Sequence, residues 1–194
     1  AWKLAAVLGG KAPVSLIESY DYERRAASRE NIMNSTRSTD FITPKFRASR
    51  TFRDAALALA RDFPFARALI NSGRLSVPTA QTGSALDTPD IDTDWKGGPG
   101  PGRAMVDAPL GSDWLVDRLG TDFTLLVCGQ PPPYPPPQGE GREGVSVIDI
   151  AGSPLATERY DARPGTVYLI RPDRYVAARW RTADAGKVRS EERR

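Results

Sequence analysis

The sequence contains no histidine and a single cysteine, Cys128, among its 194 residues. The lack of histidine excludes His-based catalytic triads, histidine metal sites and histidine acid–base catalysis from this chain. One thiol cannot form an internal disulfide, a CxxC redox pair or a cysteine-rich zinc site. We therefore expect no metal site, and a reducing, cytoplasmic compartment.

Long apolar runs are also absent. No stretch approaches the ~20 apolar residues that a membrane span needs, so we expect no membrane partner. The first residues, AWKL, do not resemble a secretory signal. The chain does not begin with Met, and no capping residue precedes its first helical positions, so we expect further residues upstream.

Neither sign of charge predominates in the sequence. Lys and Arg number 27 and Asp and Glu number 24, which gives a net charge of +3. Basic and acidic residues are interspersed, as in Glu23-Arg24-Arg25, whereas a nucleic-acid-binding surface carries a stripe of one sign. We therefore expect no nucleic-acid partner.

The first part of the chain reads as helical. Residues 1–8 form an amphipathic segment that Gly9-Gly10 would end. A second helix follows Pro13 and runs to about residue 35, and further helices are expected at residues 51–60 and 63–70. Helical spacing predicts that two sets of residues face a core: Leu16, Ile17 and Tyr20, then Phe52, Ala55, Ala56, Leu59 and Ala60.

Glycine and proline, 17 of each, gather in the middle of the chain. The run at residues 97–102, GGPGPG, fits neither a regular helix nor a central strand. We interpret residues 76–105 as a Pro/Gly-rich linker that lies over a surface, with Trp95 as its anchor.

The second half predicts a small sheet with helices on its faces. Ser112 or Asp113 would cap a short helix with Trp114, Leu115 and Leu119 inward. Strands are expected at residues 123–128, 145–150, 166–170 and 175–180, the last two joined by an RPDR turn. A last helix is expected in the polar tail from residue 183. The predicted fold class is α/β (α+β).

Several strings together resemble the class A FAD-dependent aromatic monooxygenases, which have the para-hydroxybenzoate hydroxylase fold, and within them the branch with phenol hydroxylase and 3-(3-hydroxyphenyl)propionate hydroxylase. The resemblance covers nearly the whole chain. The most specific strings come first: AWKLAAVLGG (1–10), AP (12–13), LIESY (16–20) and ERR (23–25). Later strings support them by order: SGRLS (72–76), DAPL (107–110), FTLL (123–126) and PGTVYLIRPD (164–173).

The resemblance implies a C-terminal portion with three parts. Residues 1–75 would be the helical end of the FAD- and substrate-binding region, residues 76–105 the linker, and residues 106–194 a thioredoxin-like domain without CxxC. In this branch that domain is redox-inactive and is linked to dimer contacts or stability, so a homodimer is expected. Cys128 agrees, since Gly129-Gln130-Pro131 follows it.

The resemblance also implies FAD as cofactor, NADH or NADPH as co-substrate, and an aromatic small molecule as substrate. The N-terminal end of the first helix would point toward the flavin, which makes Ala1 and Trp2 the nearest cofactor-binding candidates. No GxGxxG string follows a first strand, and residues 97–102 do not replace one. We therefore expect the FAD motifs to lie upstream, no catalytic residue in this chain, and no activity from it alone.

Some candidates have a structural alternative that we favour. Trp2 suits packing on the buried helix face better than cofactor contact. Arg24 and Arg25 suit a solvated helix face better than NADPH phosphate binding. Cys128 suits a buried, inert thiol.

Two proline features stay open. The run Pro131–Pro137 suits a stiff loop better than a polyproline ligand for an aromatic groove. Pro164 precedes a strand where thioredoxin-like folds place a cis proline, although trans is favoured.

A different class of function fits the same residues. The missing nucleotide fingerprint and the lack of catalytic residue types allow a non-catalytic, thioredoxin-like interaction or dimerisation module with a helical extension. An in-frame upstream segment containing GxGxxG would favour the enzyme, and a start codon near Ala1 would favour the module.

Overall fold

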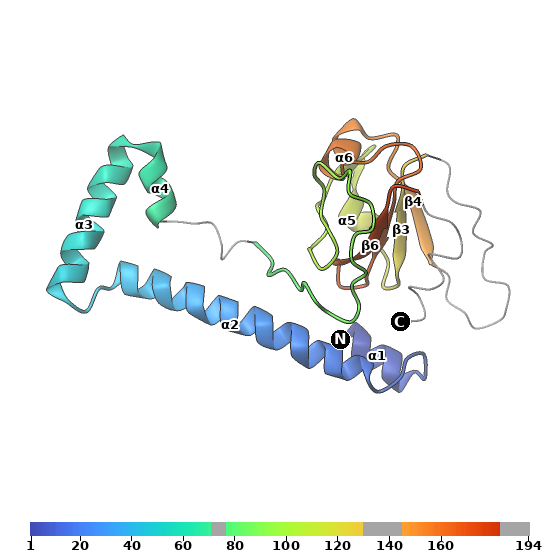
Figure 1. The fold of residues 1–194 in the computed structure, drawn as a ribbon, viewed down its shortest axis with the longest axis horizontal. Coiled ribbons are helices and arrows are strands. Elements are labelled where there is room, and N and C mark those ends of the chain that lie inside the picture. The colour runs from blue at the N-terminus through green and yellow to red at the C-terminus, as the bar shows by residue number, and fades with distance from the viewer. Residues whose placement is uncertain (71–76, 130–144, 183–194) are drawn as a thin grey trace. The chain divides into compact units, whose positions relative to one another are not determined.

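A computed structural model describes residues 1–70, 77–129 and 145–182 and contains both helices and sheet (Figure 1). The mixed fold class expected from the sequence is confirmed. Contacts divide the chain into two compact units, residues 1–21 with 80–194 and residues 22–79. The SGRLS string (72–76), the Pro131–Pro137 run and the expected C-terminal helix lie outside the described residues.

Helix α1 (Trp2–Leu8) ends where the glycine pair predicts. The amide of Gly9 donates to the carbonyl of Ala5 at 2.9 Å, and Gly10 adopts φ 68°. A positive φ is easy for glycine and ends a helix by turning the chain away.

Helix α2 (Leu16–Ile42) continues seven residues beyond the predicted end near residue 35. Residues 36–42 contain no glycine or proline, and the helix stops shortly before Pro44, which disfavours helical backbone in the residue preceding it. The hydroxyl of Thr43 donates to the carbonyl of Thr39 at 2.8 Å in the last turn. At the start of α2, Leu16 and Ile17 are half-buried, whereas Tyr20 is exposed.

Helices α3 (Arg47–Asp62) and α4 (Pro64–Ile70) pack on each other in the unit of residues 22–79. Their buried residues are small: Ala56, Ala60 and Ala66. The prediction that Phe52, Ala55 and Leu59 face a core was wrong for this chain, because all three are exposed. The short α4 covers only the narrow strip of α3 that carries the two buried alanines.

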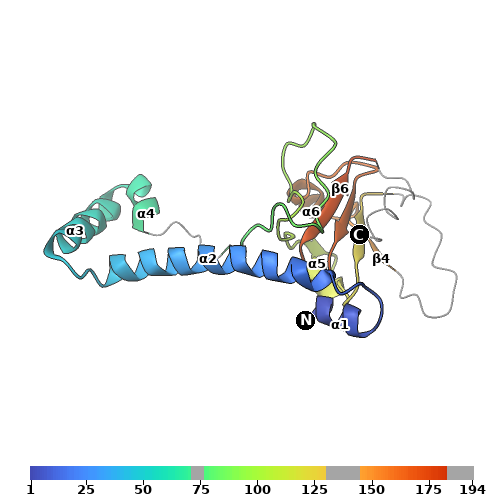
Figure 2. The ribbon, with the colours of Figure 1, turned by 60° about the horizontal axis from the view of Figure 1, so that its bottom comes forward.

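The second half forms a four-stranded sheet in the order β4 (Ser146–Asp149), β3 (Thr124–Val127), β5 (Val167–Ile170), β6 (Val176–Trp180). Strands β3 and β4 are parallel, and β3–β5 and β5–β6 are antiparallel. All four predicted strands are present. Helix α1 lies beside one end of this sheet in both ribbon views (Figures 1 and 2).

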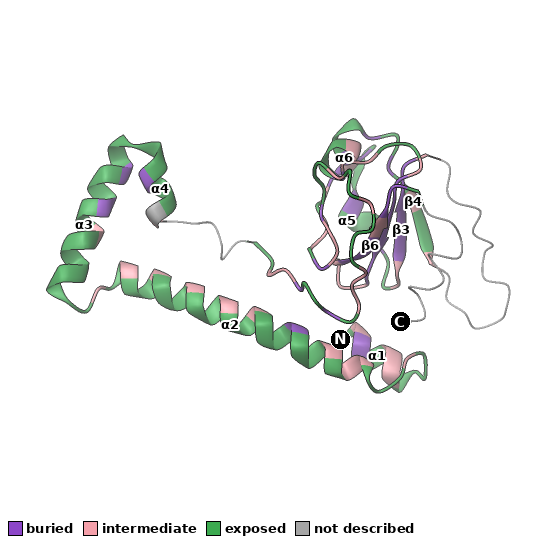
Figure 3. Ribbon diagram, viewed as in Figure 1, coloured by how far each residue is buried: buried purple, intermediate pink, exposed green. Residues whose placement is uncertain are grey.

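Burial explains why the central strands read as continuous apolar runs. Every residue of β3 and β5 is buried, whereas β4 is largely exposed (Figure 3). Alternate residues face opposite sides of the sheet. Leu126 and Ile170 join a core with the helices on one face, while Leu125 and Leu169 pack with Trp180 on the other.

Helix α5 (Leu115–Arg118) follows a short antiparallel pair, β1 (Pro109–Leu110) and β2 (Asp113–Trp114). Neither Ser112 nor Asp113, the expected capping residues, caps helix α5. The Asp107 carboxylate instead accepts the Val116 amide at 3.0 Å, and Asp113 pairs with Arg118. Trp114 is exposed, contrary to prediction, because it precedes the helix in extended conformation.

Helix α6 (Pro154–Arg159) was absent from the sequence prediction. Its signal is Ser153-Pro154, in which the serine hydroxyl accepts the Ala156 amide at 3.2 Å and proline occupies the first turn. Every described peptide bond is trans, including the one before Pro164. Within the described ranges, no helix is both long and apolar enough to cross a membrane.

The edge of β6 is covered by residues 81–104. The amide of Gly102 donates to the carbonyl of Val176 at 2.9 Å, and the amide of Thr88 donates to Ala177 at 2.9 Å. Gly102 is required here: its φ is 76°, and a Cβ would lie 2.6 Å from an Asp87 carboxylate oxygen. The residues expected to lie over a surface are therefore hydrogen-bonded to the sheet.

Candidate functional site

The candidate site is the contact between α1 and the C-terminal sheet, and Trp2 lies at its centre. The indole Nε1 of Trp2 donates to Asp173 Oδ2 at 2.9 Å. Its ring meets Phe123 edge-on, with centroids 5.7 Å apart. Trp2 thus packs on the sheet domain, which agrees with its expected structural role, and the polar end of the indole finds the partner that a packed tryptophan needs.

Arg171 pairs with Asp173 and lies near the Trp2 ring, so it holds this contact in place. Its side chain is fully buried and forks onto Asp173, with Nε 3.1 Å from Oδ1 and Nη2 2.8 Å from Oδ2. A second carboxylate, Asp87, lies 3.7 Å away. The guanidinium also lies 5.7 Å from the Trp2 ring centre and 5.8 Å from that of Tyr175. A buried charge is tolerated only when it is paired in this way.

The β5–β6 turn supplies these groups. The sequence predicted a turn at residues 171–174, and the amide of Arg174 closes it by donating to the Arg171 carbonyl at 2.9 Å. Arg174 adopts φ 68° and sends its guanidinium to the Leu119 and Gly120 carbonyls. Sequence reasoning identified the turn, but nothing local showed that it binds a helix 171 residues away.

Lys3 is a second contact that the sequence did not reveal. It is 3% exposed, and its ammonium donates to the Ser19 hydroxyl at 2.9 Å. Ser19 in turn donates to the Leu16 carbonyl at 2.6 Å. Since lysine is almost never fully buried without partners, this chain of hydrogen bonds ties α1 to the first turns of α2.

Ala1 and Trp2, the nearest cofactor-binding candidates, lie at the N-terminal end of the described chain. Ala1 is exposed, and Trp2 packs on the sheet. Flavin contact by either residue stays a prediction.

The described residues contain no glycine-rich turn opening a helix that could bind the diphosphate of FAD. The turn from β4 into α6, residues 150–153, has a single glycine, Gly152. The string GEGREG (139–144) has the spacing GxGxxG, but it precedes strand β4 rather than opening a helix, and it lies outside the described residues. Nor do the described ranges contain a His, Cys, Asp and Glu cluster that could hold a metal.

Trp95 anchors the covering segment through a separate cluster. Its ring lies between two guanidinium groups, 4.0 Å from Arg179 and 3.6 Å from Arg181, and meets Tyr168 edge-on at 5.6 Å. Each arginine also pairs with a carboxylate: Arg179 with Asp90 at 2.7 Å, and Arg181 with Asp94 and Asp161.

Asp94 and Asp161 complete this cluster on the Arg181 side. Asp161 Oδ2 lies 2.5 Å from Arg181 and accepts the Lys96 amide at 2.8 Å. Desolvation alone would raise the pKa of both carboxyls, but their hydrogen bonds outweigh it, so each pKa lies below its ordinary value. For Asp94 the donors are Arg181 and Arg163, which reaches it from the surface.

Cys128 directly follows β3 and is buried. Burial, together with the nearby Asp149 carboxylate, raises the pKa of its thiol. A raised pKa leaves little thiolate, which is the reactive form. The geometry therefore favours an inert thiol.

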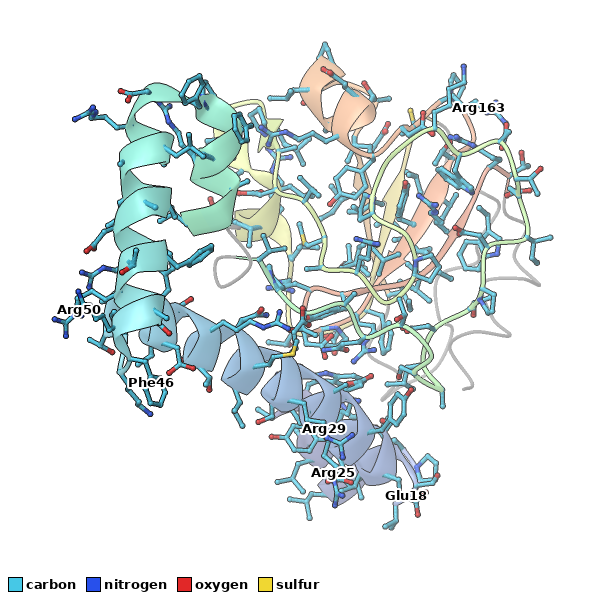
Figure 4. The ribbon with its side chains drawn as sticks, turned by 60° about the vertical axis from the view of Figure 1, so that its left-hand side comes forward. Glu18, Arg25, Arg29, Phe46, Arg50 and Arg163 are labelled. Atoms are coloured by element: carbon cyan, nitrogen blue, oxygen red, sulfur yellow. The ribbon has the colours of Figure 1, made fainter. Side chains whose placement is uncertain are left out.

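Arg24 and Arg25 are both exposed on α2. Figure 4 shows Arg25 and Arg29 along the same stretch of this helix. Their exposure agrees with the solvated face that the sequence favoured over NADPH phosphate binding.

No family model matches the chain, but individual proteins do. It is 28% identical over 208 residues to the 3-(3-hydroxy-phenyl)propionate/3-hydroxycinnamic acid hydroxylase of Mycolicibacterium vanbaalenii, covering 91% of this chain and 36% of the relative. It is 27% identical to aklavinone 12-hydroxylase RdmE of Streptomyces purpurascens, covering 95% of this chain and 35% of that protein.

Solved structures give the same fold. The rebeccamycin biosynthetic enzyme RebC with reduced flavin matches 99% of this chain and 39% of its own, at a TM-score of 0.66 and 21% identity. The flavin-dependent monooxygenase PieE, in complex with FAD and substrate, matches 98% of this chain and 41% of its own, at a TM-score of 0.65 and 23% identity.

Over nearly its whole length, this chain is therefore similar to a part of proteins named as hydroxylases of 3-hydroxyphenylpropionate and of aklavinone. It shares its fold with a part of a flavin-dependent monooxygenase of known structure. The resemblance drawn from the sequence is confirmed. The chain spans little more than a third of the length of these relatives, 36% for the first, which is consistent with a C-terminal portion.

Proposed function

We propose that this chain is the C-terminal portion of an FAD-dependent monooxygenase that uses NADH or NADPH and O2 to hydroxylate an aromatic, phenolic substrate. The observation that carries the proposal is the match to aromatic hydroxylases over 91–95% of this chain. The absence of histidine from the chain fits a division in which the catalytic groups and the FAD motifs lie upstream.

In this proposal α1 contributes electrostatics rather than chemistry. Bound FAD supplies the activation of oxygen, and the protein supplies position and charge. The N-terminal end of this helix, which the sequence predicts to lie upstream of Ala1, carries roughly half a positive charge. That charge would stabilise an anionic reduced flavin, while Trp2 holds the later turns of the helix against the sheet.

The C-terminal sheet is proposed to be a thioredoxin-like domain that acts in homodimer contacts or stability rather than redox chemistry. Its parallel β3–β4 pair flanked by the antiparallel β5–β6 hairpin supports this assignment. The lone, buried Cys128 supports a redox-inactive role. The proposed parts are residues 1–75, 76–105 and 106–194, in a cytoplasmic protein.

Expression of the complete coding region tests the function. The purified protein should be yellow, should consume NADH or NADPH with a phenolic substrate, and should release a hydroxylated product that mass spectrometry detects. The present chain, produced alone, is the matched control and should show none of these three results. A colourless full-length protein that takes up no added FAD would overturn the proposal.

The second candidate is a non-catalytic thioredoxin-like interaction or dimerisation module. The sheet topology favours it independently of any flavin. The coding region discriminates the two: an in-frame upstream segment that folds as a nucleotide-binding unit supports the enzyme, and a start codon near Ala1 supports the module.

A further inference from the structure

Helix α1 contacts the C-terminal sheet through Trp2. The hydrogen bond of its indole joins residues 171 positions apart in the sequence. Tertiary contacts of this kind, rather than the local sequence of the helix, can set where α1 lies against the sheet.

Asp173, which accepts the hydrogen bond from the Trp2 indole, is itself held in place. Both carboxylate oxygens of Asp173 are held by the fork of Arg171, so the group cannot rotate freely. Bidentate pairs of this kind fix geometry as well as adding energy. Oδ2 of Asp173 accepts from Arg171 and from the Trp2 indole together. The indole therefore binds an acceptor whose position the β5–β6 hairpin has already set.

We propose that Arg171 and Asp173 are positioning residues for helix α1, through which the β5–β6 hairpin of the C-terminal sheet sets the place of this helix. The consequence for flavin rests on the function proposed above, in which the N-terminal end of the helix points toward the cofactor. The C-terminal sheet then acts on the cofactor site from a distance, through one buried arginine, one carboxylate and one indole.

Hydrogen exchange of the α1 amides in the full chain tests the positioning directly. Trp2→Phe removes the indole donor but leaves the Arg171–Asp173 pair intact. It should speed exchange of the amides of Ala5 and Gly9, which close the helix, by about tenfold, the effect expected for loss of a hydrogen bond to a charged group. Trp114→Phe, at an exposed tryptophan, is the matched control and should leave these rates unchanged.

Two variants at Asp173 separate positioning from general destabilisation. Asp173→Asn keeps an acceptor for the indole and should preserve most of the protection of α1, whereas Asp173→Ala should lose it. The double variant W2F/D173A should exchange no faster at Ala5 than the faster single variant, because both remove the same bond. If Trp2→Phe leaves α1 exchange unchanged, or if the two effects simply add, the proposal is wrong.

The flavin consequence is measured separately, in protein from the complete coding region. Trp2→Phe should weaken FAD binding several-fold by fluorescence titration, and Trp114→Phe should not. Faster α1 exchange with unchanged FAD affinity would support the positioning role and count against the flavin-facing role of α1. Unchanged exchange with weakened FAD affinity would overturn the positioning role while leaving the proposed function intact.

Discussion

The guanidinium carbon of Arg181 lies 3.6 Å from the centre of the Trp95 ring. Arg179 lies 4.0 Å from the same centre, so the indole is held between two charged planes. Such contacts are worth about 0.5–2 kcal/mol each, according to how far they are desolvated. This pairing attaches the segment over β6, and its removal has a measurable consequence.

Trp95→Ala should lower the free energy of unfolding by about 2–3 kcal/mol, since it removes a large packed ring together with its cation–π contacts. Urea denaturation followed by circular dichroism measures this. Trp114→Ala removes an exposed indole and should cost far less. Equal effects of the two substitutions would show that Trp95 does not anchor the segment.

Stability should fall in acid through Asp94 and Asp161. Both pKa values lie below the ordinary value of 3.8, so the unfolded chain takes up protons first. Their contribution is present above that pH and is lost as pH falls through the lower folded-state values. The double variant D94N/D161N should flatten the acid limb of a plot of unfolding midpoint against pH, below about pH 4. An unchanged limb would contradict the assignment.

Gly102→Ala should destabilise the protein by about 1–3 kcal/mol, the range for a residue forced into a sparsely populated backbone region. The new Cβ would lie 2.6 Å from the Asp87 carboxylate at φ 76°. Gly100→Ala is the matched control, because there the nearest atom is the Arg179 side chain at an ordinary 3.6 Å. Thermal unfolding of both variants measures the difference, and similar melting temperatures would refute this reading of Gly102.

Cys128 should resist thiol reagents in the native protein. Its thiol is 5% exposed and its pKa is raised by burial. Reaction with a chromogenic disulfide at pH 8 should be slow until denaturant is added, and then stoichiometric. Fast labelling of the folded chain would show instead a reactive thiol. Cys128→Ala, which has no thiol, sets the background.

The chain produced alone should associate or aggregate. Large exposed apolar side chains gather in the unit of residues 22–79, and Figure 4 shows Phe46 projecting beside the start of α3. Exposed patches of this kind mark surfaces that are covered in the working assembly. Light scattering should report species larger than a monomer, reduced in the double variant F52S/F65S. A monodisperse wild-type monomer would contradict the prediction.

The strands of the sheet could be predicted from the sequence because the patterns that indicate them are local. Buried central strands need continuous apolar runs, and residues 124–127 and 167–170 supply them. The turn between β5 and β6 carries Pro172-Asp173, which is sufficient to predict a reversal of the chain. The same locality explains the end of α1 at Gly9-Gly10.

The missed features depend on partners remote in sequence. Asp107 caps α5 from outside the helix, so no pattern beside Leu115 reveals it. Arg171 looked like an ordinary turn residue, yet it is fully buried because Asp87 and Asp173 neutralise it. Helix α6 is different: the Ser153-Pro154 signal was present and was masked by the shortness of the helix.

The backbone of β6 is occupied along its outer side by residues 81–104, through the amides of Thr88 and Gly102 and the carbonyl of Arg103. An unpaired strand is a template on which other chains extend a sheet. A protease cut that released this segment would uncover that template without touching the core. The glycine- and proline-rich stretch therefore occupies hydrogen-bonding groups of β6 that would otherwise be open to the strand of another chain.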